Sequence, residues 1–231
     1  MRKLLTILFL FCIIIIGFGE FVFPSLMTAS VRTRVANRLA TNDVQVAMGT
    51  DPSFLLMLGQ IQSLHIAANG AHIGDVKLRE ITMDGSQILC DMPAFILEHR
   101  AEVRRADKLE MHAVLDADSI REILIQKVDR LENAEVTLDT DGVHVRANAK
   151  IFGKTADIAM DGVIVDDLGN LYFHMTRLSV KGAHIGKAEF GEMFGNIRLA
   201  AADKMPFGMK ITQVQQTDGA VIVTAALPGS R

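Results

Sequence analysis

Residues 143–151 read Val-His-Val-Arg-Ala-Asn-Ala-Lys-Ile, with an apolar side chain at every odd position and a polar one at every even position. Successive side chains of a β-strand point to opposite faces of the sheet, so this period of two predicts a strand with one apolar and one wet face. Asp141-Gly142 precedes the strand and is a hairpin signal, because glycine tolerates a positive φ. The stretch therefore predicts an antiparallel sheet that buries one side.

The same alternation recurs over most of the chain, and it predicts a sheet built from consecutive hairpins. Further hairpin signals are Asp84-Gly85, Asp218-Gly219 and the cluster at 167–170. Breaks in the period of two predict β-bulges, which bend and twist a sheet. The expected strands are 43–48, 61–68, 72–84, 86–91, 102–115, 135–140, 143–151, 155–165, 171–180, 208–216 and 220–227. We predict an α+β fold, in which a long curled antiparallel meander wraps around a few helices.

Two helical patterns precede most of these strands. Pro24 begins the first, whose apolar stripe comprises Met27, Val31, Val35 and Leu39. This amphipathic helix either packs its stripe into the core or lies on a membrane surface. Residues 51–59 form the second, with an Asp-Pro start and a glycine stop around five consecutive apolar residues. A short helix that is apolar on all sides must be buried or touch lipid.

A third helical pattern begins near Ser119, which fits a capping box with Glu122. Its apolar side chains share one face and are Ile120, Ile123, Leu124, Val128 and Leu131. We expect this face to pack on the apolar side of the sheet.

The N-terminus has the pattern of an export signal. Arg2 and Lys3 lead into the apolar run 4–18, and no acidic residue occurs before Glu20. As a helix this run spans about 22 Å, which is shorter than the roughly 30 Å hydrocarbon core of a bilayer. We therefore expect 1–19 to be a signal peptide or a membrane anchor, and 20–231 to form a single extracytoplasmic domain, anchored in the membrane or released to the periplasm or cell envelope.

Composition excludes some classes of function. After residue 19 the chain carries 22 basic and 27 acidic residues, a balance of −5 that disfavours nucleic-acid binding. Cys90 is the only cysteine outside the leader, so no internal disulfide is expected. The chain also has 12 Met and 12 Phe, and such side chains either fill a core or accommodate flexible apolar ligands.

Catalytic and metal-binding patterns are absent from the sequence. The seven histidines lie singly, without a paired spacing that aims two imidazoles at one metal, and there is no nucleophile elbow or phosphate loop. We predict no enzymatic activity, no cofactor and no metal.

One cluster of mixed charge is either a solvated edge or a phosphate site at the mouth of an apolar groove. Its candidate headgroup residues are Arg100, Arg104, Arg105 and Lys108.

Several segments together resemble the LmeA family of phospholipid-binding envelope proteins. They are the box 51–61, Leu64-x-Ile66, Asp118-Ser119-Ile120, Asp141-Gly142-Val143, Ile151-Phe152-Gly153 and Asp218-Gly219-Ala220-Val221. The resemblance covers roughly residues 20–227. It implies a fold similar to the tubular lipid-binding proteins, in which a sheet wraps around a helix and leaves an apolar groove for acyl chains. It carries no catalytic residue. A pair of Gly-Ala-His-Ile-Gly segments, at 70–74 and 182–186, is not part of the family's pattern.

These observations predict an exported, membrane-tethered protein that shelters the acyl chains of a phospholipid, for lipid transfer or maintenance in the bacterial cell envelope. A phospholipid or other acyl lipid and the membrane are its expected partners. The candidate lipid contacts are Leu55, Leu56, Ile123, Leu124, Val145, Ile158, Phe173 and Phe194. One alternative is a structural envelope module that binds a protein and has a filled interior. Another is an envelope-lipid hydrolase or transferase, which requires His, Asp or Glu groups that converge beside the groove. A structure with His72 and His184 close together near carboxylates would favour it.

Overall fold

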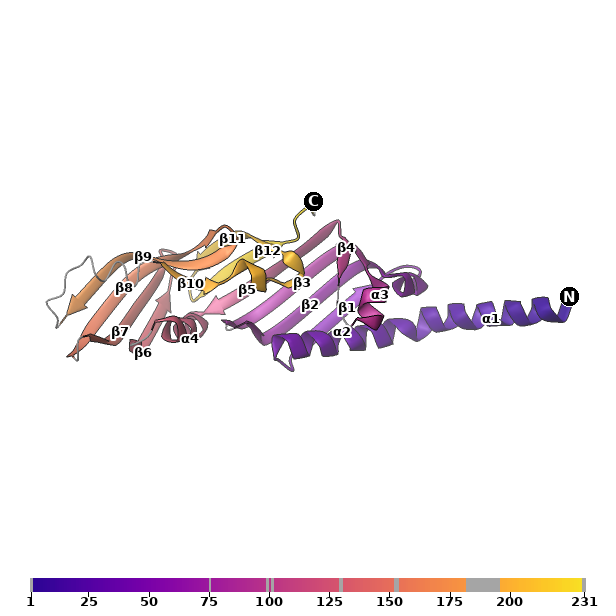
Figure 1. The fold of residues 1–231 in the computed structure, drawn as a ribbon, viewed down its shortest axis with the longest axis horizontal. Coiled ribbons are helices and arrows are strands. Elements are labelled where there is room, and N and C mark those ends of the chain that lie inside the picture. Colours follow the sequence, from indigo (N-terminus) through magenta and orange to yellow (C-terminus); the bar gives the residue numbers. More distant parts are fainter. Residues whose placement is uncertain are drawn as a thin grey trace. The chain divides into compact units, whose positions relative to one another are not determined.

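The computed structural model describes residues 2–74, 76–98, 100, 102–128, 131–151, 154–181 and 196–229, and Figure 1 shows them coloured along the sequence. The elements, in chain order, are α1 (Arg2–Phe21), α2 (Phe23–Leu39), β1 (Val44–Gly49), η1 (Ser53–Leu58), β2 (Gln60–Ile73), β3 (Val76–Cys90), α3 (Met92–Leu97), β4 (Val103–Arg105), β5 (Lys108–Asp116), α4 (Ala117–Lys127), β6 (Leu131–Leu138), β7 (Val143–Ile151), β8 (Lys154–Asp167), β9 (Asn170–Lys181), β10 (Asn196–Ala200), η2 (Ala202–Lys204), η3 (Pro206–Gly208), β11 (Lys210–Thr217) and β12 (Ala220–Ala226).

The described residues are mostly curled antiparallel sheet with a few helices, which confirms the predicted fold class. Their strands form two sheets. A seven-stranded sheet has the order β1-β2-β3-β5-β12-β11, with β4 paired to β3, and a five-stranded sheet has the order β10-β9-β8-β7-β6. The five-stranded sheet is the expected meander. In the other sheet, β12 of the C-terminal hairpin β11–β12 pairs with β5. Hairpin signals do not predict this pairing, because the two strands lie far apart in the chain.

The chain divides into two compact units, each described here by itself. The first unit comprises Met1–Ala68, Thr82–Met111 and Leu227–Arg231, and the second comprises Asn69–Ile81 and His112–Ala226. The expectation of a single domain over 20–231 stays a prediction.

In the second unit, the five-stranded sheet curls around α4. Val143, Val145 and Ala147 of β7 are buried, as the alternation predicts, and they pair with buried even positions of β8. Helix α4 contacts both β6 and β10, which are the two opposite edge strands of this sheet. One helix can reach both edges only if the sheet bends around it, so α4 fills the concave apolar face.

Helix α4 begins one residue after Asp116, not at Ser119 as the capping box predicts. The Asp116 carboxylate accepts hydrogen bonds from the Ser119 backbone N–H at 2.9 Å and from the Ser119 hydroxyl at 2.8 Å. Aspartate is a strong N-cap because its short side chain reaches the free amides of the first turn. Ser119 therefore contributes to the cap from inside the helix.

A glycine makes room for the largest side chain of this interior. The β8–β9 register shifts between Asp161 and Gly162, as in a β-bulge. A Cβ on Gly162 would lie 2.6 Å from two ring carbons of Phe173 and 2.6 Å from the carbonyl oxygen of His174. The Phe173 ring thus packs against the bare backbone of Gly162.

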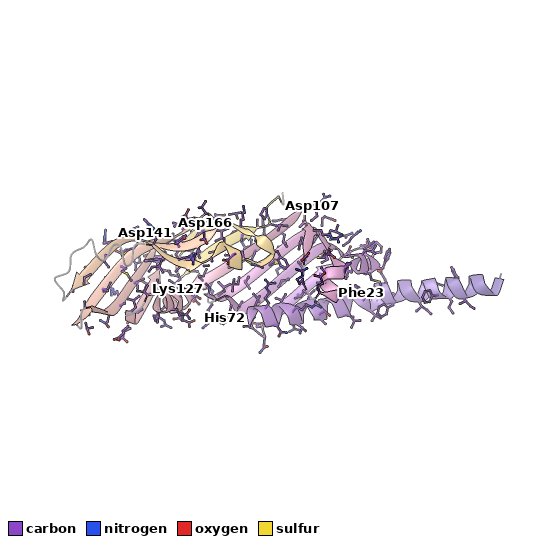
Figure 2. The ribbon with its side chains drawn as sticks, viewed as in Figure 1. Phe23, His72, Asp107, Lys127, Asp141 and Asp166 are labelled. Carbon is purple, nitrogen blue, oxygen red and sulfur yellow. The ribbon has the colours of Figure 1, made fainter. Side chains whose placement is uncertain are left out.

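In the first unit, helices α2 and α3 pack through a small apolar cluster. Met27, Met92 and Phe95 are buried together, with Phe23 and Val31 packed against them. Figure 2 labels Phe23, which lies where α1 gives way to α2. Of the two alternatives for the α2 stripe, the core packing is therefore confirmed for Met27 and Val31.

Two local predictions in this unit are wrong. Asp84-Gly85 is no hairpin, because β3 runs unbroken through it, and a Cβ on Gly85 would lie 2.6 Å from Ile88 Cδ1. This glycine serves close packing instead of a turn. The expected strand 102–115 divides into β4 and β5. Residues 53–58 form a 3-10 helix, and Gly59 ends it with the left-handed φ of 81° that favours glycine.

Candidate functional site

The predicted lipid contacts of the second unit line the interior between α4 and the curled sheet. Ile123 and Leu124 lie on the buried face of α4, and Val145, Ile158 and Phe173 lie on the buried face of β7, β8 and β9. None of the five is more than 2% exposed. Phe194 lies outside the described residues. The structure therefore brings five predicted residues into one dry apolar region, which α4 occupies in the described chain.

The two predicted contacts of the first unit have different surroundings. On η1, Leu56 is buried and Leu55 is half-buried, while Phe54, Met57 and Leu58 are exposed. The helix therefore uses Leu56 for the core and presents three other large apolar side chains to the outside. The sequence pattern, which is apolar on every side, does not tell these roles apart.

Helix η1 lies against the end of α1. The backbone N–H of Phe54 donates to Glu20 Oε2 at 3.3 Å, and a Cβ on Gly19 would lie 3.0 Å from the Phe54 Cβ and 3.1 Å from the Met57 sulfur. The small Gly19 thus allows the two helices to touch. Among the described residues, no helix combines the length and the apolar character needed to cross a bilayer.

The four predicted headgroup cations each have an acidic partner. Arg100 pairs with Glu98 and Glu102, Arg105 with Asp107, and Lys108 with Glu110 at 2.9 Å. Their side chains are at least half exposed, and surface ion pairs of this kind contribute little to stability. A lipid phosphate would have to compete with these carboxylates.

Arg104 has a more specific partner. Its guanidinium donates two hydrogen bonds to Asp91 Oδ2, at 3.0 Å from Nε and 2.6 Å from Nη2. The other oxygen of Asp91 accepts from the Ala94 backbone N–H at 3.1 Å and so caps α3. This backbone hydrogen bond, followed by the one from Arg104, lowers the pKa of Asp91. Arg104 therefore has a structural role in holding the start of α3.

A shallow pocket of about 460 Å³ lies on the same unit. His65 Nδ1 and Asp84 Oδ1 are 2.7 Å apart on its wall, and Lys108 is also part of the lining. The other lining residues are Ala47, Met48, Gly49, Ser63, Leu64, Gly85 and Ser86.

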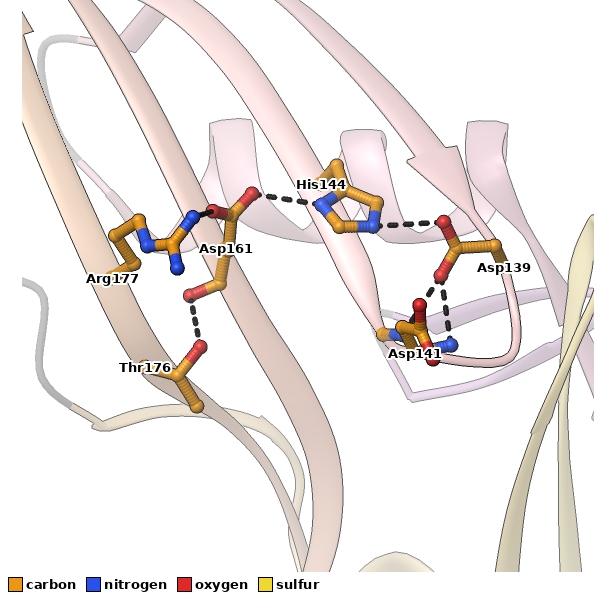
Figure 3. Close-up of polar contacts among 7 residues, drawn as sticks. Asp139, Asp141, His144, Asp161, Thr176 and Arg177 are labelled. Carbon is orange, nitrogen blue, oxygen red and sulfur yellow. Dashed lines mark hydrogen bonds and ion pairs between the residues drawn. The ribbon is translucent and has the colours of Figure 1, made fainter.

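On the polar face of the five-stranded sheet, His144 lies between two carboxylates (Figure 3). Its Nδ1 is 2.8 Å from Asp161 Oδ1, and its Nε2 is 3.0 Å from Asp139 Oδ2. Arg177 lies on the far side of Asp161, at 3.6 Å. The Asp161 interaction is the largest cause of a raised pKa at His144, with a further rise from Asp139. This cluster favours a protonated imidazole. It links β7 to β8 through Asp161 and to the turn between β6 and β7 through Asp139.

The described residues can also be compared with the requirements of a metal site and of a nucleophilic site. These described residues contain no group of three His, Cys, Asp or Glu side chains placed to hold a metal ion. Burial raises the pKa of the Cys90 thiol to about 11, so it is a poor nucleophile. His184, whose approach to His72 would favour the hydrolase alternative, lies outside the described residues.

Sequence reasoning missed three features of these sites. Gly162 carries no signal that it underlies Phe173, because the contact joins two strands. Of the two carboxylates around His144, Asp161 lies on β8 and Asp139 lies in the turn between β6 and β7, and only the neighbouring Asp141-Gly142 carried a signal in the sequence, that of a hairpin. Helix α3 had a readable start in Asp91 with Pro93 close behind it.

The family model described as LmeA-like phospholipid-binding matches residues 18–226 of the chain. No curated protein matches it, and no solved structure matches it. The matched range covers all of the second unit and the first unit except residues 1–17 and 227–231.

Proposed function

We propose a function on the premise that this chain belongs to the LmeA-like phospholipid-binding family. The protein shelters the acyl chains of a phospholipid against the apolar concave face of its five-stranded sheet. Ile123 and Leu124 of α4 and Phe173 of β9 are among the contacts. The observation that carries this proposal is that α4 touches both edge strands of the sheet, because a sheet bent in this way has a long apolar trough.

Burial of acyl chains in such a trough supplies enough free energy for firm binding. Each methylene removed from water contributes about 0.8 kcal/mol, so two chains of ordinary length offset the cost of ordering the lipid. The five interior candidates are fully buried against one another and their neighbours. Acyl chains therefore enter by displacing α4 from part of the sheet, and the helix covers the trough when no lipid is present.

In the first unit, taken by itself, three exposed cations are the candidate ligands of a lipid phosphate. Arg100, Arg105 and Lys108 exchange their carboxylate partners for phosphate oxygens, which arginine binds in a two-pronged geometry. Arg104 remains paired with Asp91, which caps α3.

The protein works outside the cytoplasm, in the cell envelope, where it transfers or maintains phospholipid. Support comes from the sequence of 1–19, in which two cationic residues precede an apolar run. The same segment holds the protein beside its lipid source when it is retained. No catalytic step is part of this function.

A second candidate is a structural envelope module that binds no lipid. One observation favours it, namely that the described interior candidates of the second unit are already completely buried. This module would keep α4 permanently in the sheet.

Photo-crosslinking tests the first candidate against the second. The full chain is incubated with vesicles of a phospholipid that carries a diazirine near the end of one acyl chain, and the crosslinked residues are identified by peptide mass spectrometry. We expect crosslinks on the buried positions of β7, β8 and β9, including Val145, Ile158 and Phe173. The matched control is the exposed set on the same strands, Arg146, Ala159 and His174, which should stay unmodified.

Native mass spectrometry and an organic extract of the same sample give the stoichiometry and the lipid. One phospholipid per chain supports the proposal. A folded protein that stays free of lipid after incubation, with crosslinks spread equally over both faces of the strands, would replace it with the structural module.

A further inference from the structure

Six large apolar side chains around the contact between α1 and η1 are exposed. They come from the end of α1, the turn after it, and η1, and we call them the apolar tip: Phe18, Phe21, Val22, Phe54, Met57 and Leu58. Phe21 is 82% exposed and Leu58 is 61% exposed. We propose that the apolar tip docks on the surface of a phospholipid bilayer and inserts Leu58 and its neighbours below the headgroups.

The tip is a built surface, because defined contacts hold its two halves together. Glu20 accepts a hydrogen bond from the Phe54 N–H, and Gly19 packs against Phe54 and Met57. At its other end, η1 stops at Gly59, whose carbonyl oxygen accepts from the Cys90 N–H at 2.8 Å. The exposed side chains are thus presented by backbone that is fixed at both ends of η1.

The exposed side chains are surplus to the core of this unit. Leu56 supplies the buried anchor of η1, and Met27, Met92 and Phe95 fill the space between α2 and α3. A soluble surface rarely gathers large apolar side chains in one patch without a partner. A short helix that is apolar on every side must be buried or touch lipid, and the structure buries only one of its sides.

Continuity identifies the partner as a lipid surface. The exposed apolar side chains do not end at the tip but continue along α1 through Ile14, Ile13, Phe11, Leu10 and Phe9. A protein pocket would have to be as long as α1 to cover these side chains, whereas a bilayer offers an extended apolar layer. The proposal rests on the proposed function in taking the surface to be phospholipid.

Charge indicates which kind of phospholipid surface suffices. The cations Arg100 and Arg104 of the same unit are compensated by Glu98, Glu102 and Asp91. Attraction to anionic headgroups therefore contributes little, and burial of apolar area supplies the binding. Docking should occur on vesicles of phosphatidylcholine alone and should depend only weakly on salt.

The test places an environment-sensitive fluorophore on the tip of the full chain. Leu58→Cys is made in a Cys12→Ser background and labelled with a nitrobenzoxadiazole maleimide. Cys90 stays, since its raised thiol pKa and its burial make it react slowly, and the labelled parent without Leu58→Cys measures its background. Met57→Cys provides a second, independent tip position.

The matched control is Asn42→Cys. Asn42 is exposed in the same unit but follows the opposite end of α2, a helix of 17 residues that is about 25 Å long at roughly 1.5 Å per residue. With phosphatidylcholine vesicles, the probes at Leu58 and Met57 should gain several-fold in emission, shift to the blue and be quenched by lipids with a doxyl group on the acyl chain. The Asn42 probe should stay quenchable by iodide in the water.

Equal iodide quenching at Leu58 and Asn42 would overturn the proposal. So would a Leu58 probe that is shielded from iodide but unaffected by doxyl lipid, because a protein partner or a second copy then covers the tip. The lipid extract of the same sample separates this proposal from the proposed function. Quenching by doxyl lipid without a co-purified phospholipid supports docking and refutes the interior site, and the reverse result refutes docking alone.

Discussion

The Arg34 guanidinium lies over the face of the Phe95 ring, with its central carbon 3.9 Å from the ring centroid. The same guanidinium donates a hydrogen bond from Nη1 to the carbonyl oxygen of Phe95 at 3.0 Å. Arg34 belongs to α2 and Phe95 to α3, so one side chain joins the two helices through a cation–π contact and a charge-assisted hydrogen bond. An arginine of an apparently wet helix face thus packs against the apolar cluster.

Arg34→Gln should lower the free energy of unfolding by about 1–3 kcal/mol, because it removes both interactions and leaves the Phe95 carbonyl without its donor. Urea unfolding of the full chain, followed by circular dichroism, measures the change. Arg32→Gln removes an exposed arginine from the same helix and should change the free energy by less than about 0.5 kcal/mol. Equal effects of the two substitutions would show that the Arg34 contact contributes nothing.

Gly162→Ala should destabilise the second unit by about 1–3 kcal/mol, since the added methyl group overlaps the Phe173 ring and the His174 carbonyl oxygen. Backbone on one side and a buried ring on the other leave no flexible group to move. Gly49→Ala is the matched strand control, because its methyl group would meet only the Ser63 hydroxyl at 3.4 Å. Thermal unfolding of the two variants side by side decides the point, and a Gly162→Ala variant as stable as Gly49→Ala would mean that Phe173 has free space around it.

Local periodicity was enough to predict β7, β8, β9, β11, β12 and the curled meander, but it missed β10 and the division of 102–115 into β4 and β5. Residues 143–151 form β7 as predicted, and the buried face of α4 holds Ile120, Ile123 and Leu124 as its stripe indicates. The rest of the predicted stripe is not helical, because α4 ends at Lys127, Val128 is its C-cap and Leu131 begins β6. Both patterns depend only on neighbours along the chain, which a single sequence displays directly. The five interior candidates followed from the same patterns, although their full burial did not.

The features that sequence missed depend on contacts between distant segments. Gly85 has the local signature of a turn, yet the side chains of Ile88 and Leu109 occupy the place of a Cβ there. The acidic partners of Arg100 and Lys108 were visible nearby in the sequence, but their pairing geometry was not. Whether η1 is buried or exposed depended on how α1 and α2 pack around it, and no periodicity reports that.

Asp116→Ala should loosen α4, because it removes the acceptor for both the N–H and the hydroxyl of Ser119. Loss of an N-cap costs about 1 kcal/mol. Ser119 is buried, so its hydroxyl then lacks a partner and adds to the cost. Asp116→Asn keeps an oxygen in place and should restore most of the stability. Hydrogen exchange of the α4 amides is the readout, and equal exchange in the alanine variant and the unmodified chain would contradict the cap.

If α4 covers the lipid trough, Asp116→Ala should also speed the uptake of phospholipid. A looser helix leaves the sheet more often, and each departure exposes Phe173 and its neighbours. The time course of crosslinking with the diazirine lipid measures this, with Asp116→Asn as its control. Faster helix exchange with unchanged uptake would show that lipid enters by another route.

His144 should make the stability of the second unit depend on pH. Its pKa is raised above the ordinary 6.5 by Asp161 first and then by Asp139. The folded protein therefore holds the proton more tightly than the unfolded chain does. This contribution is fully present below about pH 6.5 and is lost as the pH rises through the raised pKa.

Burial acts to raise the pKa of Asp139, but hydrogen bonds from Asp141, Gly142 and His144 outweigh it and lower the pKa below 3.8. Asp139 thus remains a carboxylate throughout the window from about pH 5 to pH 8.

His144→Gln tests this dependence when urea unfolding is measured between pH 5 and pH 8. The difference in free energy between the unmodified chain and the variant should be largest near pH 5 and should shrink towards pH 8, because glutamine has no charge to lose. His174→Gln is the matched control, since His174 bonds to the neutral amide of Asn196 at 2.7 Å. A His144→Gln difference that stays constant over this range would mean that the two carboxylates hold a neutral imidazole, and that the cluster positions β7 by hydrogen bonding alone.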